Sequence, residues 1–442
     1  MLINDSLLRL REYLAGIRMR HAFSFQVAIT FLAQIAQLIL SIATAAIIAR
    51  WLGPEGKGAI AIALLVPGML ALLLSGGIGV ANVYYAGSQR IELPILVGNS
   101  VTFALAASFI GGGIVGVLAW TGWLGRLIPG VSIFLILLAM LGFPFALLGS
   151  HLATILQGLQ RIVEINIARL IQAGLFLLLT ILLVIHLGLG LPGALLASIL
   201  SVVFYCFQIG WLLYRQGASL LPRWNPGVAR STLSFGLRGY LGNLLQFFNY
   251  RLDAFLVNFF LGPGGVGIYT VSVRLAELLW TLPNAVGFVI FPKASNTQPD
   301  AMNRFTPRVF YATLALTLLS GAGLALIGRQ LISVIYSDIF SPAYLPMLAL
   351  LPGAVLLGSA KVLTNEIAGR GYPLYNSINA GLALVLTIIL DLTLIPIWGV
   401  LGASIASSIA YLIIFFTAIY FYRRVSTTQA ATITPSRTTN LQ

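Results

Sequence analysis

The sequence has very little charge for its length. Only 36 of its 442 residues are ionised at neutral pH, 25 Lys or Arg and 11 Asp or Glu, which is 8% of the chain. Soluble domains carry about 25% charged residues, and a soluble protein of this size needs more polar side chains to cover its surface. The composition therefore excludes a soluble cytosolic enzyme.

Cysteine and histidine are also scarce. The one cysteine, Cys206, excludes an intramolecular disulfide framework. His151 and His186 have no second His, Cys or carboxylate at ligand spacing, so the sequence predicts no metal site. There is also no nucleotide-binding loop and no Ser-His-Asp arrangement, and we expect no cofactor. The net charge of +14 does not indicate a nucleic-acid partner, because most basic residues flank apolar runs.

Apolar residues are abundant: 59% of the chain is hydrophobic and the mean hydropathy is +0.98. Between residues 25 and 422 we count twelve apolar runs of about 20 residues or more. A helix that crosses about 30 Å of hydrocarbon needs about 20 such residues, whereas the strands of a membrane β-barrel are shorter and alternate. The predicted fold is an all-α polytopic membrane protein with about twelve transmembrane helices.

Basic residues near the ends of the runs indicate the orientation in the membrane. With a cytoplasmic N-terminus, 17 Lys or Arg fall on cytoplasmic segments and four on outer segments, and the opposite orientation reverses this ratio. The outer four are Arg50, Lys57, Arg126 and Arg329. We therefore expect both termini to be cytoplasmic.

The two ends of the chain are not expected to cross the membrane. Residues 1–22 mix Leu at helical spacing with four Arg and lack a cleavage site, so they do not read as a signal peptide. They suit a cytoplasmic or interfacial helix on an anionic leaflet, or simply a basic topology anchor. Residues 425–442 are rich in Ser and Thr without apolar periodicity, which predicts a disordered cytoplasmic tail.

An internal repeat divides the sequence into two halves. The motif LGPEGKG at Leu52–Gly58 recurs as LGPGGVG at Leu261–Gly267, an offset of 209 residues. The same offset relates further blocks: LLGS at 147–150 and 356–359, and small residues of 193–198 and 402–407. Small residues are common in membrane helices, so each match is weak alone. Several blocks in order at one offset indicate two related halves.

Each half has six predicted helices, so both enter the membrane in the same orientation. We predict an N-terminal bundle over residues 23–215, a cytoplasmic linker over 216–231 and a C-terminal bundle over 232–424. A pseudo-two-fold axis along the membrane normal would relate the bundles, as in transporters that rock one bundle against the other around a substrate. The repeated Gly-Pro motifs lie between membrane helices, so they predict short outer hairpins rather than phosphate-binding loops.

Ionisable residues inside spans are costly and usually functional, and here they gather in the second half. Arg251 and Asp253 precede the outer turn around Gly262, and Arg274 and Glu277 follow it. At 1.5 Å per residue, Asp253 reaches the depth of Arg274, and Arg251 that of Glu277. We expect these two pairs to face each other. Further ionisable residues in the predicted spans of this half include Arg238, Lys361 and Asp391.

Polar residues form stripes at helical spacing on three spans. They are Thr30, Gln34, Gln37, Ser41 and Thr44 on the first span, Asn243, Gln246, Tyr250 and Asp253 on the seventh, and Thr270, Arg274, Glu277, Thr281 and Asn284 on the eighth. The stripes imply a wet internal cavity. Its basic residues would attract a phosphate-bearing ligand, because guanidinium groups match phosphate geometry. The alternative is that the charges are structural ion pairs between helices.

Several of these motifs resemble one known family. Ala49–Gly58, Asn249–Asp253, Leu261–Tyr269, Arg274–Glu277 and Phe291–Lys293 are similar to segments of the oligosaccharide and polysaccharide flippases, in the multidrug/oligosaccharidyl-lipid/polysaccharide exporter superfamily. The resemblance covers nearly the whole chain. It implies two six-helix bundles around a cationic cavity, and transport of undecaprenyl-diphosphate-linked oligosaccharide across the bacterial plasma membrane, driven by a proton or sodium gradient. With twelve spans rather than fourteen, we expect the lipid-II-type subgroup to match poorly.

The resemblance and the intramembrane charges together predict a flippase for surface polysaccharide biosynthesis, not an enzyme. We expect substrate-binding residues at Arg238, Arg251, Arg274, Lys361, Asn243, Gln246 and Gln37, and ion coupling at Asp253 and Glu277. The expected partners are the lipid-linked oligosaccharide, membrane lipids, an ion gradient and polysaccharide polymerase machinery.

Three other functions are weighed against this prediction. A multidrug antiporter of the same superfamily would need carboxylates and aromatics for cationic ligands, and the basic excess argues against it. A membrane polysaccharide polymerase or ligase would need a large outer loop with catalytic Arg or His, but the longest predicted outer connections have about fifteen residues. A non-catalytic lipid scaffold would not need charges inside the bilayer.

Overall fold

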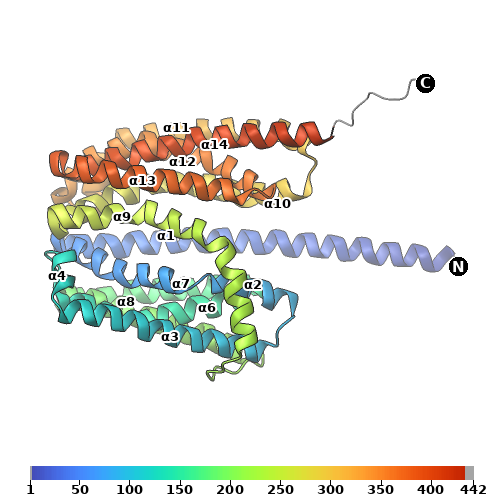
Figure 1. Ribbon diagram of the computed structural model, residues 1–442, viewed down its shortest axis with the longest axis horizontal. Helices are drawn as coiled ribbons and strands as arrows, with labels where there is room; N and C mark the ends of the chain where they lie inside the picture. The colour runs from blue at the N-terminus through green and yellow to red at the C-terminus, as the bar shows by residue number, and fades with distance from the viewer. Residues whose placement is uncertain (1, 434–442) are drawn as a thin grey trace. The chain divides into compact units, whose positions relative to one another are not determined.

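The computed structural model describes residues 2–433, and within them the side chains of residue 30 and of 32–237, 240–287 and 289–427. Every regular element in this part of the chain is a helix (Figure 1). The predicted all-α class is confirmed.

The first half of the chain forms eight α-helices, the seventh of which continues as a π-helical turn over Ile181–His186. Their bounds are α1 Leu2–Leu74, α2 Ile78–Ser88, α3 Leu93–Trp120, α4 Trp123–Leu127, α5 Ile133–Met140, α6 Phe143–Gly158, α7 Ile162–Thr180 and α8 Gly190–Tyr214. The second half forms six, with 3₁₀ turns at Leu278–Trp280 and Asp338–Ala343. Their bounds are α9 Pro226–Glu277, α10 Thr281–Asn296, α11 Pro299–Tyr336, α12 Tyr344–Gly369, α13 Pro373–Trp398 and α14 Val400–Ile433.

Ten helical segments of the described residues are long and apolar enough to cross a membrane. The two longest, of 43 and 57 residues, are each divided by one non-helical glycine: Gly53 in α1 and Gly262 in α9. These two segments count as two crossings each, so the described part of the chain holds twelve. The predicted number of spans is confirmed.

The glycine breaks are alike in conformation as well as in sequence. Gly53 has φ 65° and ψ −175°, and Gly262 has φ 72° and ψ −175°. A side chain at such a positive φ would be strained. Pro54 and Pro263 follow, and proline suits the first position of the next helix. The predicted Gly-Pro hairpins are therefore found at both places.

The described residues separate into two compact units. The first unit consists of the residues up to Ile47, Pro67–Ile114 and Leu137–Leu237. The second unit consists of Ile48–Val66, Val115–Ile136 and the residues from Arg238 onward. Two segments of the first sequence half thus group with the second half.

In the first unit, α6 packs between α2 and α8, and α7 packs on α8. Its core is aliphatic and includes Val97, Leu152, Ile155 and Ile209, which are almost fully buried. Close backbone approach also contributes: a Cβ on Gly158 would lie 2.6 Å from the Val83 carbonyl oxygen, so only glycine lets α6 reach α2 here.

In the second unit, α12 packs against α10, α11, α13 and α14, and Figure 1 shows α11 to α14 lying side by side. The backbone N–H of Gly353 on α12 donates to the Ser408 hydroxyl of α14 over 3.0 Å. A Cβ on Gly353 would lie 2.6 Å from the Ser408 Cα, so this crossing also requires glycine.

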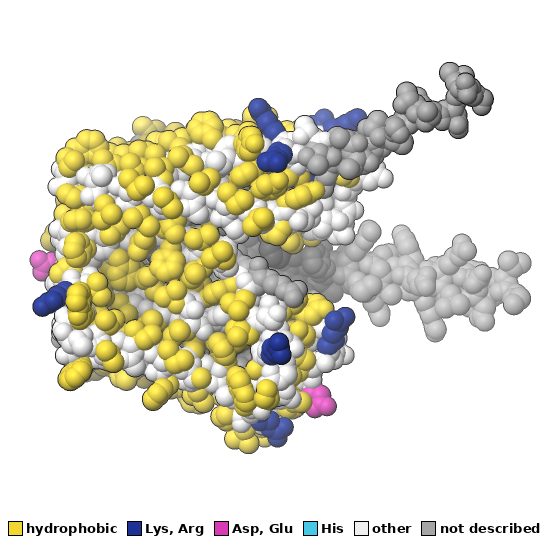
Figure 2. Space-filling view, viewed as in Figure 1, with side chains coloured by type: hydrophobic (Ala, Val, Ile, Leu, Met, Phe, Trp, Pro, Cys, Tyr) yellow, Lys and Arg dark blue, Asp and Glu magenta, His cyan; other side chains and the backbone are white. Residues whose placement is uncertain are grey.

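The surface fits a membrane setting. Large apolar side chains such as Phe109, Trp120 and Leu326 are exposed by 85%, 88% and 79%. In Figure 2 hydrophobic side chains cover the middle of the visible face, and most of the Lys and Arg lie toward its two ends. Such a surface is favourable only against lipid.

The two chain ends extend further as helix than the sequence suggests. α1 runs without interruption from Leu2 into the first span, so residues 2–22 are continuous with it. α14 continues to Ile433, although the sequence predicts disorder from residue 425. The remainder of the predicted tail, 434–442, lies outside the described residues.

Candidate functional site

The two arms of α9 on either side of Gly262 bring Arg251 and Glu277 together in the second unit. The Arg251 Nη1 and Glu277 Oε1 atoms are 3.2 Å apart, which confirms the predicted pairing. The Arg251 side chain is 41% exposed and that of Glu277 is 16% exposed. The guanidinium can therefore bind a further anion while it remains paired.

Asp253 has different partners from those expected. Its side chain is buried, and its carboxylate accepts hydrogen bonds from the Tyr269 hydroxyl, from the Ala254 N–H at 2.7 Å and from the Ser407 hydroxyl at 3.3 Å. The prediction that Asp253 would pair with Arg274 is therefore wrong. Hydroxyl groups of α9 and α14 bind the Asp253 carboxylate in place of Arg274. The depth of a residue along its helix does not predict such partners.

A second carboxylate, Asp391 on α13, lies within electrostatic range of Asp253. It is fully buried, and neither of its oxygens has a hydrogen-bond partner in the described part of the chain. Nearby, between α9 and α13, the Thr387 hydroxyl donates to the Asn249 Oδ1 atom over 3.2 Å. The Asn249 amide nitrogen is buried and has no hydrogen-bond partner among the described residues. We call Asn249, Asp253, Thr387 and Asp391 the carboxylate cluster.

Lys361 on α12 joins the Arg251–Glu277 pair. Its ammonium donates to the Asn284 Oδ1 atom over 2.9 Å and interacts electrostatically with Glu277. The same nitrogen lies 4.4 Å from the centroid of the Trp280 ring and 5.8 Å from that of Tyr250. Both distances are within the range of cation–π attraction.

The aromatic rings beside Lys361 form a box with Tyr411 of α14. The Tyr250, Trp280 and Tyr411 rings contact one another with centroid distances of 5.3, 6.2 and 5.7 Å. The Trp280 indole N–H donates to the Ala354 carbonyl over 2.9 Å, which fixes the ring. The Arg251–Glu277 pair, Lys361, Asn284 and these rings are called the cationic cluster below.

The structure places the other predicted site residues as follows. Asn243 is exposed on α9, and Gln246, one turn further along, has a buried amide nitrogen without a partner among the described residues. Gln37 belongs to the first unit, where its amide donates to the Asn166 carbonyl over 3.4 Å. Arg274 lies within electrostatic range of Lys57 and Tyr336. Arg238 lies on α9, but its side chain is outside the described ones.

Sequence reasoning missed two parts of this arrangement. It recorded Asp391 as an intramembrane charge without giving it a role, although a carboxylate in an apolar helix is itself a functional signal. It also missed the Tyr250–Trp280–Tyr411 box. No spacing rule could find it, because α9, the 3₁₀ turn after it and α14 each contribute one ring.

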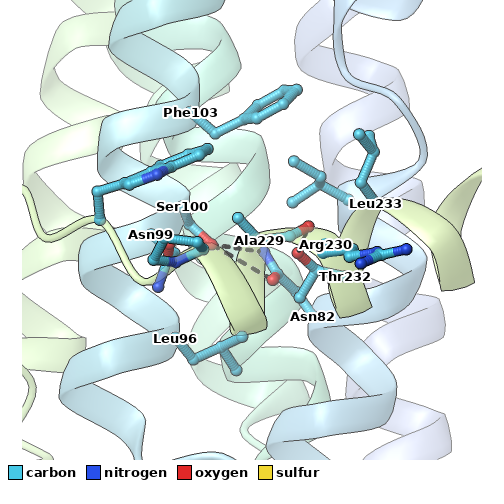
Figure 3. Close-up of a pocket in the computed structure, with 12 residues that line it drawn as sticks. Asn82, Leu96, Asn99, Ser100, Phe103, Ala229, Arg230, Thr232 and Leu233 are labelled. Carbon is cyan, nitrogen blue, oxygen red and sulfur yellow. Dashed lines mark hydrogen bonds between the residues drawn. The ribbon is translucent and has the colours of Figure 1, made fainter.

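A pocket of about 300 Å³ lies in the first unit between α2, α3 and the start of α9 (Figure 3). The Asn82 amide donates to the Ser100 hydroxyl over 3.0 Å and to the His151 carbonyl. Figure 3 shows the Asn82–Ser100 pair in the middle of the pocket, with Phe103 beyond it and the Arg230 side chain extending away. Its other buried polar side chains, Asn99 and Thr232, bond to backbone groups. None of the predicted site residues lines the pocket.

The carboxylate cluster offers two acids, an amide and a hydroxyl. Within the described residues, no three His, Cys, Asp or Glu side chains come together as a metal site would require. Buried oxygens of this kind can hold a proton or one small cation. The cationic cluster, in contrast, combines two cations with one carboxylate and keeps a net positive charge toward an anionic ligand.

Residues 47–345, about two thirds of the chain, match the family model described as polysaccharide biosynthesis protein. The chain belongs to this family. It is also 24% identical over 243 residues to an uncharacterized membrane protein of Methanocaldococcus jannaschii, covering 52% of this chain and 46% of that protein. The probable flippase AglR of Haloferax volcanii is 27% identical over 186 residues, covering 41% of this chain and 39% of AglR. Each match thus spans less than half of the relative's length.

Solved structures are similar over more of the chain. A lipid II flippase MurJ in an inward closed conformation has a TM-score of 0.75 at 16% identity, covering 91% of this chain and 90% of that one. An inward-facing multidrug resistance transporter of the MATE family, in the MOP superfamily, has a TM-score of 0.71 at 18% identity, covering 90% and 96%. These likenesses show the fold, two six-helix bundles. The expectation that the lipid-II-type subgroup would match poorly is wrong for the fold.

Proposed function

We propose that this protein is a flippase. It moves an undecaprenyl-diphosphate-linked oligosaccharide across the bacterial plasma membrane by alternating access, for surface polysaccharide biosynthesis, as a transporter rather than an enzyme. The observation that carries the proposal is the cationic cluster: Lys361 and Arg251 hold two positive charges against one carboxylate inside a membrane-spanning unit. A cluster of this sign, in a chain of the polysaccharide biosynthesis family, suits a diphosphate.

In the proposed mechanism the two clusters have different main tasks, and Glu277 of the cationic cluster also takes part in ion coupling. Arg251 and Lys361 bind the diphosphate, and the Tyr250–Trp280–Tyr411 box supports the sugar, since aromatic side chains commonly line ligand sites. The remaining proposed substrate contacts are Arg238, Asn243, Gln246, Arg274 and Gln37. Asp253 and Glu277 couple transport to a proton or sodium gradient, and we add Asp391 as the partner of Asp253. The termini are cytoplasmic, and the released product passes to polysaccharide polymerase machinery.

The rival function is export of cationic drugs, which the aromatic box would suit. In this protein, however, the box already contains a cation of its own, because the Lys361 ammonium lies 4.4 Å from the Trp280 centroid. A second cation there would be repelled by Lys361 and Arg251, whereas an anion would be attracted. The box therefore favours an anionic substrate.

The test uses the purified full-length protein in proteoliposomes. We expect it to accelerate transbilayer movement of a fluorescent undecaprenyl-diphosphate-linked oligosaccharide. Lys361→Gln should reduce the rate by about tenfold or more, because a charge-assisted contact to the diphosphate is lost. Lys293→Gln is the matched control: Lys293 lies over the Phe305 ring in the same unit, outside the cationic cluster.

Three results would contradict the proposal. Wild-type vesicles that never accelerate the lipid-linked sugar, with or without an ion gradient, exclude the flippase function. Wild-type vesicles that export a cationic dye but not the sugar favour the drug antiporter. If Lys361→Gln and Lys293→Gln behave alike, the cationic cluster does not bind the substrate.

A further inference from the structure

The outer end of the second unit contains a crossing between the two halves of the internal repeat. A Cβ on Gly58 would lie only 1.7 Å from the Pro263 carbonyl oxygen, and a Cβ on Gly267 only 2.0 Å from the Pro54 carbonyl oxygen. These four residues correspond to one another at the 209-residue offset. The helices that begin at Pro54 and Pro263 therefore touch through their backbones.

This crossing fixes the position of Lys57, the residue before Gly58. Its side chain is half-buried, and its ammonium lies 5.2 Å from the centroid of the Tyr336 ring. Tyr336 is itself almost fully buried, at 1% exposure. Lys57 is thus part of the packed outer end of the second unit and not a freely solvated loop residue.

Arg274 approaches the same place from the other repeat. It follows Gly267 by seven residues, which is two helical turns on the same face, and helical side chains lean toward the N-terminus of their helix. The Arg274 guanidinium lies within electrostatic range of both Lys57 and Tyr336. Two cations are brought together here.

Nothing in the described residues neutralises Lys57. Its ammonium makes no ion pair or hydrogen bond with them, and the Tyr336 ring contributes only a cation–π attraction. Lys57 also lies in the first turns of the helix that begins at Pro54, where the helix dipole disfavours a positive charge. The neighbouring outer cation, Arg50, differs: it donates to the Val334 and Ile335 carbonyls at the end of α11.

A half-buried cation next to a second cation is unfavourable unless an anion lies between them. We propose that Lys57 and Arg274 form an anion-binding site at the outer end of the second unit. It binds an anionic group of the transported molecule, either the diphosphate of the lipid carrier or the carboxylate of an acidic sugar. This inference rests on the proposed flippase function for its ligand and is separate from the cationic cluster of Arg251 and Lys361.

The experiment measures binding directly, with the purified full-length protein in nanodiscs and two probes, inorganic pyrophosphate and glucuronate. We expect the wild type to bind at least one probe by calorimetry, and the preferred probe distinguishes the diphosphate from the sugar carboxylate. Lys57→Gln should weaken that binding about tenfold or more, and Lys57→Arg should retain it. Lys293→Gln is again the control and should bind like the wild type.

The measurement separates this site from the rest of the mechanism. Lys57→Gln should keep the wild-type elution profile and melting midpoint, so that loss of binding is not loss of folding. Equal binding by the wild type and Lys57→Gln overturns the proposal, and so does a wild type that binds neither probe. Failure of the wild type to transport a lipid-linked sugar would overturn the flippase function. It would not affect the conclusion on anion binding at Lys57 and Arg274.

Discussion

The Asp391 carboxylate lies fully buried on α13, with neither oxygen bonded to a described residue and with Asp253 in electrostatic range. An ionised carboxylate in such a place carries a large desolvation cost without compensation. It becomes stable only when a proton or a small cation neutralises it. At the scale of single residues, this is the strongest argument that the carboxylate cluster serves ion coupling.

The corresponding prediction concerns Asp391→Asn. Because the native carboxylate has no hydrogen-bond partner among the described residues, the amide should leave the melting midpoint unchanged or raise it. Transport should become insensitive to an imposed proton or sodium gradient, with a loss of about tenfold or more in the gradient-driven rate. Vesicle assays with and without each gradient measure this effect.

Asp300→Asn provides the comparison, since Asp300 is exposed in the first turn of α11. It should keep the full response to the gradient. A large drop in the melting midpoint of Asp391→Asn, with the gradient response intact, would show that Asp391 is structural and would remove it from the ion-coupling site.

At the scale of helices, α1 and α9 share one motif: a glycine with positive φ, a proline, and a second glycine at the crossing. The shape of each hairpin follows from Gly53 and Gly262. The crossing between hairpins depends on Gly58 and Gly267, whose missing Cβ atoms leave room for a backbone carbonyl. Backbone contact of this kind is a common way for membrane helices to associate.

We therefore predict that Gly58→Ala and Gly267→Ala are both destabilising. Each adds a methyl group where a carbonyl oxygen lies within 2.0 Å of the Cβ position, an overpacking that costs about 1–3 kcal/mol. Heating followed by size-exclusion chromatography should show a lower midpoint for either variant. The two variants together should lose less than the sum, because both act on one crossing.

Gly68→Ala tests whether this effect is specific. Gly68 lies on the same helix α1 with open space around its Cβ position, so alanine there should be neutral or slightly stabilising through its higher helix propensity. If Gly58→Ala were as stable as Gly68→Ala, the close crossing of Gly58 and Gly267 would not exist in the membrane-embedded protein.

At the scale of the whole molecule, the remaining question is which end faces outward. The count of basic residues, 17 against four, assigns the Gly-Pro hairpins to the outer side. In a Cys206→Ser background, single cysteines at Glu55 or Arg126 should react with a membrane-impermeant maleimide in intact cells. Cysteines at Arg90 or Arg161 should react only after lysis. All four positions are exposed, so access alone does not decide the labelling.

The reverse labelling pattern would invert the topology and place the Lys57–Arg274 site on the cytoplasmic side. Labelling of all four positions in intact cells would mean that the cells are permeable to the reagent. Labelling of none of them would mean that the protein is not in the cell surface membrane. Cytoplasmic termini agree only with labelling at Glu55 and Arg126 in intact cells and at Arg90 and Arg161 after lysis.

The sequence alone determined the class and the plan of this protein. Apolar runs of membrane length specify helices because lipid offers no partner for an unpaired backbone. The 209-residue repeat predicted paired hairpins, and both glycines adopt nearly the same backbone angles. Depth counted from the hairpin also placed Arg251 opposite Glu277, because both lie on helices joined at a known turn.

Only the tertiary structure decided which side chains face each other across helices that are distant in sequence. Asp253 bonds to Tyr269 and Ser407 rather than to Arg274, because α14 packs beside α9 at that level. The sequence predicts that Lys57 lies in a loop. In the structure it lies beside Tyr336, because the backbones at Gly58 and Gly267 are in close contact. Periodicity specifies the face of a helix, but the rotation and height of its neighbours depend on packing of the whole bundle.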